Sequence, residues 1–416
     1  MKVFRTLDPQ RQRSLMILFV AGLLFWSSIT TLLPTLPLYI DSIGGTKQQI
    51  GLVMGAFSVG LLLSRIWLGP LADKKSRKLV LIIGTTVAAI APMGYLVFTS
   101  LPLLMGLRVF HGISIAGFTI GYSALVADLA PPGRRGELIG YMSLVAPIGM
   151  GMGPAIGGFL AVGSGYGVLF IVSSGLGVMS LVCASLVWEP YVEVKNQVEI
   201  NPFPDGFPQQ KFWQIIGSRR VLVPSFVMLI VGLIFGTIVT FLPLFIQESN
   251  IDLNPGLFYT VIAIASFTIR VFTGRASDRF GRGVFICGGL VCYFLCMLIL
   301  WIAKTSNIIL LAAILEGSGS GLVIPMMITL MTDRSPHTQI GKFFSLCIGG
   351  FDLGLIVAGP CFGLFAEQLG YRGMFAIDAG LASVALIAFT TMSNKDLPHS
   401  IRFAFGKGQD TYAINH

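Results

Sequence analysis

The sequence predicts an all-α polytopic membrane protein with twelve transmembrane helices in two six-helix bundles, and three observations lead to that prediction. The 416 residues are 54% hydrophobic and 11% charged, and the mean hydropathy is +0.81. Apolar runs are long enough to cross about 30 Å of hydrocarbon, which a soluble core does not require. The second half of the chain repeats the polar residues of the first half at an offset of 205 or 206 positions.

Each of the twelve expected helices is an apolar run of about 20 residues or more. The runs cover residues 14–40, 50–72, 79–99, 102–127, 137–161, 167–188, 221–246, 256–276, 283–303, 307–331, 342–366 and 373–393. The stretch between the sixth and seventh runs has mixed charge and four prolines, so it cannot span a membrane. We therefore expect an N-terminal bundle at 1–188, a linker at 189–220, a C-terminal bundle at 221–394 and a polar, poorly ordered tail at 395–416.

The repeat is clearest in the charged loops that follow the second and eighth runs. The matching residues are Gly69 with Gly274, Asp73 with Asp278, Arg77 with Arg282, Asp128 with Asp333, and the helix arginines Arg65 with Arg270. Two halves of one chain therefore share one fold. Several secondary transporters use such a parallel duplication to build a pathway between halves related by an axis along the membrane normal.

The net charge of +9 follows the expected membrane topology. Most of the 28 lysines and arginines lie in the termini and in alternate loops, whereas the opposite loops hold only Lys47, Lys304 and Arg372. An excess of basic residues marks the cytoplasmic side, so we expect both termini and the linker in the cytoplasm and the protein in the cytoplasmic membrane. No basic stripe is left outside these loops, which argues against a nucleic-acid partner.

The polar chemistry of the chain does not indicate an enzyme. All six cysteines lie in predicted helices, where they behave as small apolar residues and define neither a disulfide framework nor a metal site. No nucleophile with a base, phosphate loop or cofactor motif is recognisable, so we expect no enzymatic activity and no cofactor. The first apolar run lacks a small-residue cleavage site, and we expect it to be retained.

The loop at 69–78 resembles the signature that the major facilitator superfamily carries between its second and third helices. It has a glycine, an aspartate four residues later and then basic residues, although Lys74 and Ser76 stand where the signature has arginine and glycine. Gly69 is expected to allow close helix contact, and Asp73 to accept hydrogen bonds from helix amides or an arginine.

The resemblance covers nearly the whole chain apart from the linker and tail, and it implies the fold of that superfamily. It also implies a cytoplasmic gate that latches the halves. We assign to this gate Arg65, Gly69, Asp73, Arg77, Asp128, Arg270, Gly274, Asp278, Arg279 and Arg282. We expect Asp128, together with Arg134, Arg135, Glu137 and Asp333, to pair with the basic cluster of this gate.

Arg108, His111 and Gly112 in the fourth run resemble another signature of the superfamily. The spacing places Arg108 and His111 on one helical face, so both side chains can point into one cavity. A charge at this depth needs protein or water around it, which makes Arg108 a functional candidate. Arg108 either serves proton coupling or substrate positioning or forms a structural bridge, and His111 either titrates near neutral pH or only donates a hydrogen bond.

The fifth run contains Gly149, Gly153, Pro154, Gly157 and Gly158, which resembles the glycine signature of the antiporter branches of the superfamily. These glycines recur at helical spacing and clear one face for a neighbouring helix, while the proline permits a bend. The motif is thus also a packing seam. By resemblance it implies export.

Two acids lie deep in the second half, Glu316 in the tenth run and Asp352 in the eleventh. A dry site favours the protonated carboxyl and a hydrated site the ionised one, so such a residue can carry a proton during transport. Asp378 lies nearer the outer face and ranks third. The alternative for Glu316 and Asp352 is a structural pair with Arg108 or a helix-packing hydrogen bond.

We place the expected substrate cavity around Arg108, His111, Glu316, Asp352, Tyr39 and Tyr122. Further aromatic residues, Phe25, Trp26, Phe118 and Phe241, would suit an amphiphilic substrate. Three functions stay open, and we favour the first. It is a monomeric exporter in membrane lipid that exchanges a small-molecule substrate for protons, with the proton gradient as its energy source. The others are a proton symporter that imports a sugar, nucleoside or other small metabolite, and a receptor or assembly factor that no longer transports.

Overall fold

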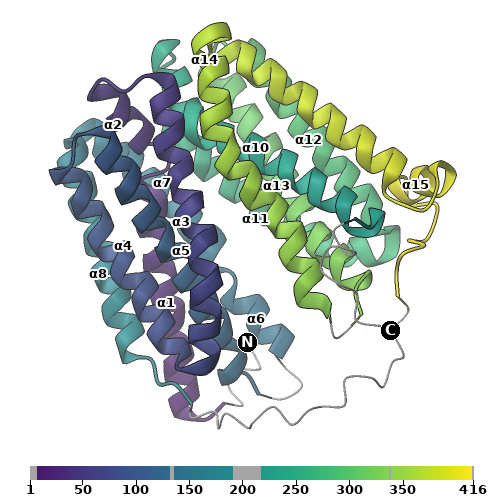
Figure 1. Ribbon diagram of the computed structural model, residues 1–416, viewed down its shortest axis with the longest axis horizontal. Helices are drawn as coiled ribbons and strands as arrows, with labels where there is room; N and C mark the ends of the chain where they lie inside the picture. Colours follow the sequence, from purple (N-terminus) through teal and green to yellow (C-terminus); the bar gives the residue numbers. More distant parts are fainter. Residues whose placement is uncertain (1–6, 132–134, 191–216, 337–338, 415–416) are drawn as a thin grey trace. The chain divides into compact units, whose positions relative to one another are not determined.

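The protein forms helices and no strands within the residues that the computed structural model describes, which are 7–131, 135–190, 217–336 and 339–414 (Figure 1). The side chains of residues 135–137, 274–275, 278–279 and 340 are not described. The chain divides into two compact units. One contains Met1–Val198 with Asn254–Thr260, and the other contains Glu199–Leu253 with Val261–His416.

The helices of the N-terminal repeat match the first six predicted runs. They are α1 (Pro9–Thr31), α2 (Leu36–Ser42), α3 (Lys47–Lys74), α4 (Arg77–Val97), α5 (Leu101–Leu129), α6 (Arg135–Met142), α7 (Val145–Gly163) and α8 (Gly165–Leu186). The first run is divided between α1 and α2, because Pro34 and Pro37 lack the amide hydrogens that a continuous helix needs. Side chains cap the starts of several helices, α1 and α3 among them. Asp8 accepts from the amide of Arg11 at 2.9 Å, and Thr46 forms a capping box at the start of α3.

The helices of the C-terminal repeat match the last six runs. They are α10 (Arg219–Glu248), α11 (Pro255–Phe280), α12 (Arg282–Ile302), α13 (Ser306–Asp333) and α14 (Ile340–Met392), followed by the short α15 (Leu397–Ala404). α14 contains two predicted runs that meet at Gly370, whose φ of 70° and ψ of 172° suit glycine. The described chain has 11 helical segments long and apolar enough to cross a membrane. Dividing α14 at Gly370 gives the twelve that the sequence predicts.

The duplication in the sequence is also a duplication in structure. α4 and α12 both contain 21 residues and begin at equivalent arginines, Arg77 and Arg282. In the first unit α4 packs on α5 and α1 packs on α7 and α8. In the second unit α12 packs correspondingly on α13, and α10 packs on α14. The repeat offset therefore relates equivalent helices as well as equivalent motifs.

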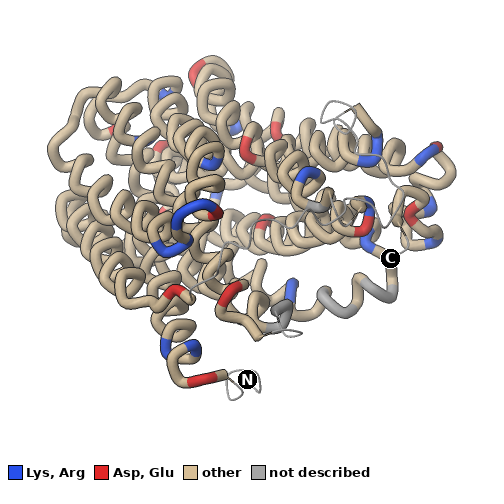
Figure 2. Tube along the Cα trace, turned by 60° about the horizontal axis from the view of Figure 1, so that its bottom comes forward, with Lys and Arg blue, Asp and Glu red and all other residues tan. Residues whose placement is uncertain are grey.

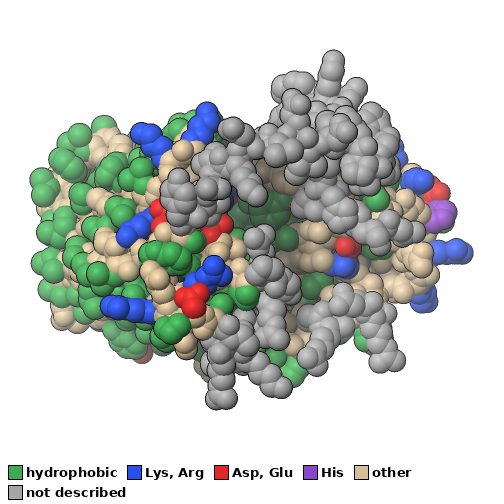
Figure 3. Space-filling view, turned by 90° about the horizontal axis from the view of Figure 1, so that it is seen from below, with side chains coloured by type: hydrophobic (Ala, Val, Ile, Leu, Met, Phe, Trp, Pro, Cys, Tyr) green, Lys and Arg blue, Asp and Glu red, His purple; other side chains and the backbone are tan. Residues whose placement is uncertain are grey.

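Many of the charged residues lie at turns and helix ends of the Cα trace (Figure 2), and the face seen from below carries both hydrophobic and charged side chains (Figure 3). Ile66 and Val162 are 72% and 80% exposed. Such surfaces are unfavourable in water but are what hydrocarbon requires of a spanning helix. The exposed flanks thus agree with a multi-pass membrane protein.

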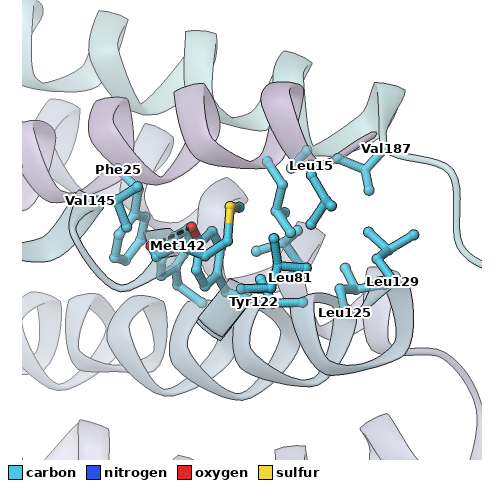
Figure 4. Close-up of a cluster of buried hydrophobic side chains, with 14 of the residues drawn as sticks. Leu15, Phe25, Leu81, Tyr122, Leu125, Leu129, Met142, Val145 and Val187 are labelled. Atoms are coloured by element: carbon cyan, nitrogen blue, oxygen red, sulfur yellow. Dashed lines mark hydrogen bonds between the residues drawn. The ribbon is translucent and has the colours of Figure 1, made fainter. Parts of the chain in front are cut away.

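A cluster of buried apolar side chains fills the interior of the first unit (Figure 4). The rings of Phe25 and Phe118 stack with centroids 3.8 Å apart, and the ring of Phe118 also stacks on Tyr122. The hydroxyl of Tyr122 donates to the carbonyl of Met142 at 2.9 Å. These aromatic residues, expected to line a cavity, are part of a packed core. Phe241 is likewise fully buried in the second unit.

The segment after Asn394 is folded against the second unit, whereas the sequence predicted a poorly ordered tail. α15 packs on α12 and α14, and a Cβ at Gly283 would collide with the carbonyl of Phe403. The amide of Ile414 donates to the carbonyl of Asp333 at 2.8 Å. The expectation was wrong because polar composition does not reveal a partner elsewhere in the chain.

A buried arginine ties this segment to three helices. Arg334 is 0% exposed, and its guanidinium forms a bidentate ion pair with Asp410 at N–O distances of 2.6 and 3.0 Å. It also donates to the carbonyl of Ser393 at 2.7 Å and to that of Arg220 at 3.0 Å. One side chain therefore joins the ends of α10, α13 and α14 to the C-terminal segment.

Replacing Asp410 with alanine should destabilise the protein. The substitution leaves the buried guanidinium of Arg334 without its carboxylate, which costs about 3 kcal/mol for a pair of this kind. Denaturant unfolding of the purified protein in detergent measures the loss. Lys407→Ala, an exposed position in the same segment, should change stability by less than about 0.5 kcal/mol. Equal effects of the two substitutions would contradict a structural role for the ion pair.

Candidate functional site

The candidate site consists of ionisable side chains buried inside predicted membrane spans. Arg108 and His111 of α5 are 7% and 1% exposed. In the second unit Glu316 of α13 and Asp378 of α14 are 0% exposed, and Asp352 of α14 is 3% exposed. Ionisable groups are rarely buried in membrane helices without a function, so these positions are the functional candidates.

Arg108 and His111 share one polar cluster in the first unit, as their spacing predicts. The Nδ1 atom of His111 lies 3.1 Å from the hydroxyl of Tyr95 of α4. The guanidinium of Arg108 lies over the ring of Phe57 of α3, 4.4 Å from its centroid. The Nε of Arg108 and the Nε2 of His111 have no hydrogen-bond partner among the described residues. The cluster therefore contains two buried nitrogen atoms that are available for further hydrogen bonds.

Glycines determine which helices meet at this cluster. A Cβ at Gly112 would collide with the carbonyl of Phe57, and a Cβ at Gly60 with that of Val109. α3 and α5 can approach only because both positions lack a side chain. Phe57 and Tyr95 belong to the cluster, but the sequence did not indicate them, because nothing in it shows which faces of α3 and α4 turn toward α5.

The two tyrosines predicted for the site lie in different surroundings. The hydroxyl of Tyr39 in α2 donates to the carbonyl of Tyr95 at 2.9 Å, which places Tyr39 beside the cluster. Its ring packs edge-on against Phe170. Tyr122 lies instead in the apolar core of the first unit, where its hydroxyl donates a hydrogen bond to the carbonyl of Met142.

Glu316 is the centre of a second cluster, in the second unit. Neither of its carboxylate oxygens has a hydrogen-bond partner among the described residues. Arg270 of α11 acts on it as a positive charge, and Tyr293 and Cys296 of α12 are further neighbours. The sequence assigned Arg270 to the gate near Asp278, whereas the structure brings its charge to Glu316.

The glycines that follow Glu316 explain how three helices meet around it. A Cβ at Gly317 would collide with the carbonyl of Ile262 in α11, and a Cβ at Gly321 with Ser266 and Ile269 of the same helix. Gly319 faces Tyr293 of α12. Glycines on two faces of α13 thus admit both neighbouring helices, which places their polar residues next to the carboxyl.

Asp352 and Asp378 occupy the two parts of α14 on either side of Gly370. Asp352 is buried and has interactions of its own. Gly350 and Gly354 on the same helix face carbonyls of α10, so α14 and α10 lie close together at this level. Thr237 of α10 approaches the carboxyl of Asp378.

An open apolar groove lies between α11 and α13 in the second unit, with a volume of about 340 Å³. It is lined by Val261, Ile264, Ala265, Thr268, Ile269, Ile314 and Ser318. The hydroxyls of Thr268 and Ser318 donate to carbonyls of their own helices. The groove therefore offers van der Waals contact and no charge.

Equivalent ion pairs close the charged ends of the two repeats. Arg77 pairs with Asp128 in the first unit, and Arg282 pairs with Asp333 at 2.5 Å in the second. Each pair joins the start of one helix to the end of the next, α4 to α5 and α12 to α13. The sequence predicted that Asp128 and Asp333 pair with basic residues of the gate, and the structure identifies these residues as Arg77 and Arg282.

The first charged loop has a partner that the sequence did not indicate. Oε1 of Glu189 accepts from the amides of Arg77 and Lys78 at 2.7 and 3.2 Å, and Oε2 accepts from the hydroxyl of Ser76 at 2.6 Å. Glu189 thus caps the start of α4. The sequence predicts that Asp73 accepts from helix amides or an arginine, whereas at the start of α4 the acceptor from the amides is Glu189. The only feature of the sequence that could have indicated this role is the position of Glu189 directly after the sixth apolar run.

The other predicted gate residues differ in how much the structure shows of them. Arg65 is half-buried on α3 and has interactions of its own, and Asp73 is exposed near the end of that helix. A Cβ at Gly69 would meet nothing within 4 Å, so the close contact expected there is not found among the described residues. The described part leaves out the surroundings of Gly274, the side chains of Asp278, Arg279, Arg135 and Glu137, and the whole of Arg134.

The glycine motif of α7 packs against α1. A Cβ at Gly149 would collide with Trp26, one at Gly153 with Thr30, and one at Gly157 with the carbonyl of Thr31. The hydroxyl of Thr30 donates to the carbonyl of Gly149 at 3.1 Å. Pro154 and Gly158 are also buried. The motif is therefore a packing seam, as the sequence indicated.

The duplicated helical units, their apolar flanks and their buried ionisable residues define a multi-pass membrane protein of the kind that moves solutes across the bilayer. The family model for the Major Facilitator Superfamily matches residues 18–303 and 253–409. The chain therefore belongs to the Major Facilitator Superfamily, and it is a transporter of that family.

Known proteins resemble the chain over most of its length. Multidrug resistance protein MdtG of Salmonella choleraesuis (strain SC-B67) is 26% identical over 385 residues, which cover 89% of this chain and 93% of that protein. The multi-drug resistance efflux pump PmrA homolog of Lactococcus lactis subsp. lactis (strain IL1403) is 25% identical over 381 residues, covering 88% and 92%. A structure of a mutant of the nucleoside transporter NupG has a TM-score of 0.77 at 13% identity, covering 90% and 98%. This last likeness confirms the fold.

Adding one methyl group at Gly157 should weaken the packing of α7 on α1. Gly157→Ala forces the new Cβ against the carbonyl of Thr31, and overpacking of this kind costs about 1–3 kcal/mol. Thermal unfolding in detergent measures the change. Gly163→Ala near the end of the same helix meets no neighbour within 4 Å and should be neutral or slightly stabilising. If Gly157→Ala and Gly163→Ala destabilise the protein to a similar extent, the loss of stability does not come from the packing of α7 on α1.

Proposed function

We propose that this transporter exports a small amphiphilic molecule in exchange for protons, by alternating access. The observation that carries the proposal is Glu316, a buried carboxyl whose oxygens lack hydrogen-bond partners among the described residues and on which the charge of Arg270 acts. A carboxyl in such a place binds a proton when the site is dry and releases it when water enters. Proton exchange at Glu316 can therefore follow the opening and closing of the transporter.

Arg270 and the first cluster have separate roles in this proposal. Arg270 stabilises the ionised form of Glu316 after the proton has left, because an opposite charge offsets part of the cost of burial. Arg108 and His111 bind the polar part of the substrate through the unpartnered Nε and Nε2 atoms, while the hydroxyl of Tyr95 holds the imidazole of His111. Asp352 is a further buried acid of the second unit and belongs to the proposed set of proton-coupling residues.

The direction and the substrate class rest on other observations. The similar proteins MdtG and the PmrA homolog are described as a multidrug resistance protein and a multi-drug resistance efflux pump. The apolar groove beside α13 suits the hydrocarbon part of an amphiphile. We further propose that the protein works as a monomer in the cytoplasmic membrane with both termini in the cytoplasm. The ion pairs Arg77–Asp128 and Arg282–Asp333 would then belong to its cytoplasmic gate.

Replacing Glu316 with glutamine should separate transport from the proton gradient. The amide keeps the size of the side chain but cannot release a proton. Proteoliposomes with an imposed pH gradient are incubated with a mixed metabolite extract, and mass spectrometry identifies the compounds that the wild type concentrates or expels. We expect the gradient-driven part of this transport to disappear in Glu316→Gln, while exchange without a gradient persists.

Glu367→Gln, an exposed position on α14, serves as the matched control and should behave like the wild type. Gradient-driven transport that survives Glu316→Gln unchanged would refute the proposed role of Glu316. Uptake in the same direction as the protons would replace export by symport, and binding to a partner protein without any transport would favour a receptor.

A further inference from the structure

The last helix, α15, exposes a stripe of large apolar side chains although it is too short to cross a membrane. It contains eight residues and follows the second part of α14 (Figure 1). Eight residues make about 12 Å of helix. Leu397, Ile401 and Phe405, the residue just beyond its end, are 52%, 42% and 66% exposed. Residues four apart lie on one side of a helix, so these three side chains form one continuous stripe.

Another side of α15 attaches the helix to the second unit. Ser400, Phe403 and Ala404 are buried. The ring of Phe403 lies 6.1 Å from that of Phe389 in α14, and the hydroxyl oxygen of Ser400 accepts from the amide of Asn394 at 2.9 Å. Each residue advances about 100° around a helix, which places the stripe beside the buried side. The attachment therefore fixes the orientation of α15 and leaves the stripe uncovered.

α15 lies at the charged end of the unit. A Cβ at Gly283 would collide with the carbonyl of Phe403, and a Cβ at Gly406 with the carbonyl of Phe280. These contacts place α15 against the end of α11 and the start of α12, next to Arg282. Charged loops mark the level at which membrane spans leave the hydrocarbon. The stripe is therefore at the boundary between hydrocarbon and headgroups.

Basic side chains accompany the stripe. Lys395, Arg402 and Lys407 are exposed, and none of the three forms an ion pair with an acid among the described residues. Asp396 is exposed as well, but its Oδ1 accepts from the amide of His399 at 2.9 Å and lies 2.6 Å from the Nδ1 of the same residue. The surface of this segment therefore carries an excess of positive charge beside apolar side chains.

We propose that α15 is an interfacial helix that binds an anionic lipid surface. The apolar stripe enters the edge of the hydrocarbon, and Lys395, Arg402 and Lys407 contact the acidic headgroups. A short helix with apolar side chains on one side and cations on another has this affinity, because both halves of the lipid complement it. In the predicted topology the surface is that of the cytoplasmic leaflet.

The charge also argues against a second copy of the chain as the partner. A symmetric contact between two α15 helices would bring identical surfaces together and place the same basic residues near one another. Such a contact would cover the stripe, but it would be opposed by repulsion between like charges. Anionic lipid covers the stripe and neutralises the cations together.

Hydrogen–deuterium exchange of the full chain in lipid nanodiscs tests the proposal. One set of discs contains phosphatidylcholine alone, and the other contains equal amounts of phosphatidylcholine and phosphatidylglycerol. We expect the peptide that contains α15 to exchange about tenfold more slowly in the anionic discs, since each basic residue near such a surface strengthens binding about fivefold. Added salt should reduce this difference. The peptide around Lys304, at the opposite end of the spans, controls for the direct effect of surface charge on exchange.

Substitutions separate the two halves of the lipid contact. Replacing Lys395, Arg402 and Lys407 together with glutamine should remove the difference between the two lipids. Arginine in place of both lysines retains the charge and should retain the difference. Leu397→Ser with Ile401→Ser should increase exchange in the anionic discs, because the stripe no longer favours hydrocarbon. Lys304→Gln is the matched control and should behave like the wild type. Thermal unfolding in detergent checks that these exposed substitutions leave the fold intact.

Three results would overturn the inference. The first is equal exchange of α15 in the two kinds of disc, and the second is a lipid difference that survives in the triple glutamine variant. The third is protection that requires two copies of the chain in one disc and ignores lipid charge, which would assign the stripe to a second copy. None of these results depends on the substrate or direction of transport, so failure of the inference leaves the proposed function unaffected.

Discussion

A charge inside a hydrocarbon layer is unfavourable unless protein groups or water surround it, and this constraint accounts for most of the arrangement. The described helices expose apolar flanks, and several of their buried ionisable residues gather in two clusters, one around Arg108 and one around Glu316. Close helix packing makes this burial possible. Glycines at 60 and 112 bring α3 to α5, and glycines at 317 and 321 bring α11 to α13. The polar sites thus depend on residues that have no side chains.

The charged ends of the two repeats have equivalent ion pairs but different neighbouring residues. Equivalent ion pairs, Arg77–Asp128 and Arg282–Asp333, follow the repeat. Beside the first pair the carboxylate of Glu189 caps α4. The residue at the equivalent position in the second repeat is Asn394, and its side chain contacts Thr411 of the C-terminal segment. Duplication therefore preserved the ion pair, while its surroundings diverged.

Much of the fold could be predicted from the sequence, because membrane spans need long apolar runs and the repeat supplied an internal comparison. Periodicity and charge predict the twelve spans, the pairing of Asp128 with a basic gate residue, and the shared face of Arg108 and His111. The neighbours of each site do not. Tyr95, Phe57 and Cys296 join their clusters through the rotation of one helix against another, which depends on packing between distant segments. The ordered C-terminal segment was mispredicted for the same reason, since the partner of Asp410 is a single buried arginine.

The pairing of Arg334 with Asp410 also sets an order of events during synthesis. The arginine is made 76 residues before its carboxylate, so both parts of α14 and the whole of α15 must follow it before the charge can be neutralised. Membrane insertion of the second repeat therefore precedes its final closure. The C-terminal segment is therefore the last part to join the second unit, because its Asp410 supplies the carboxylate that the buried guanidinium of Arg334 requires.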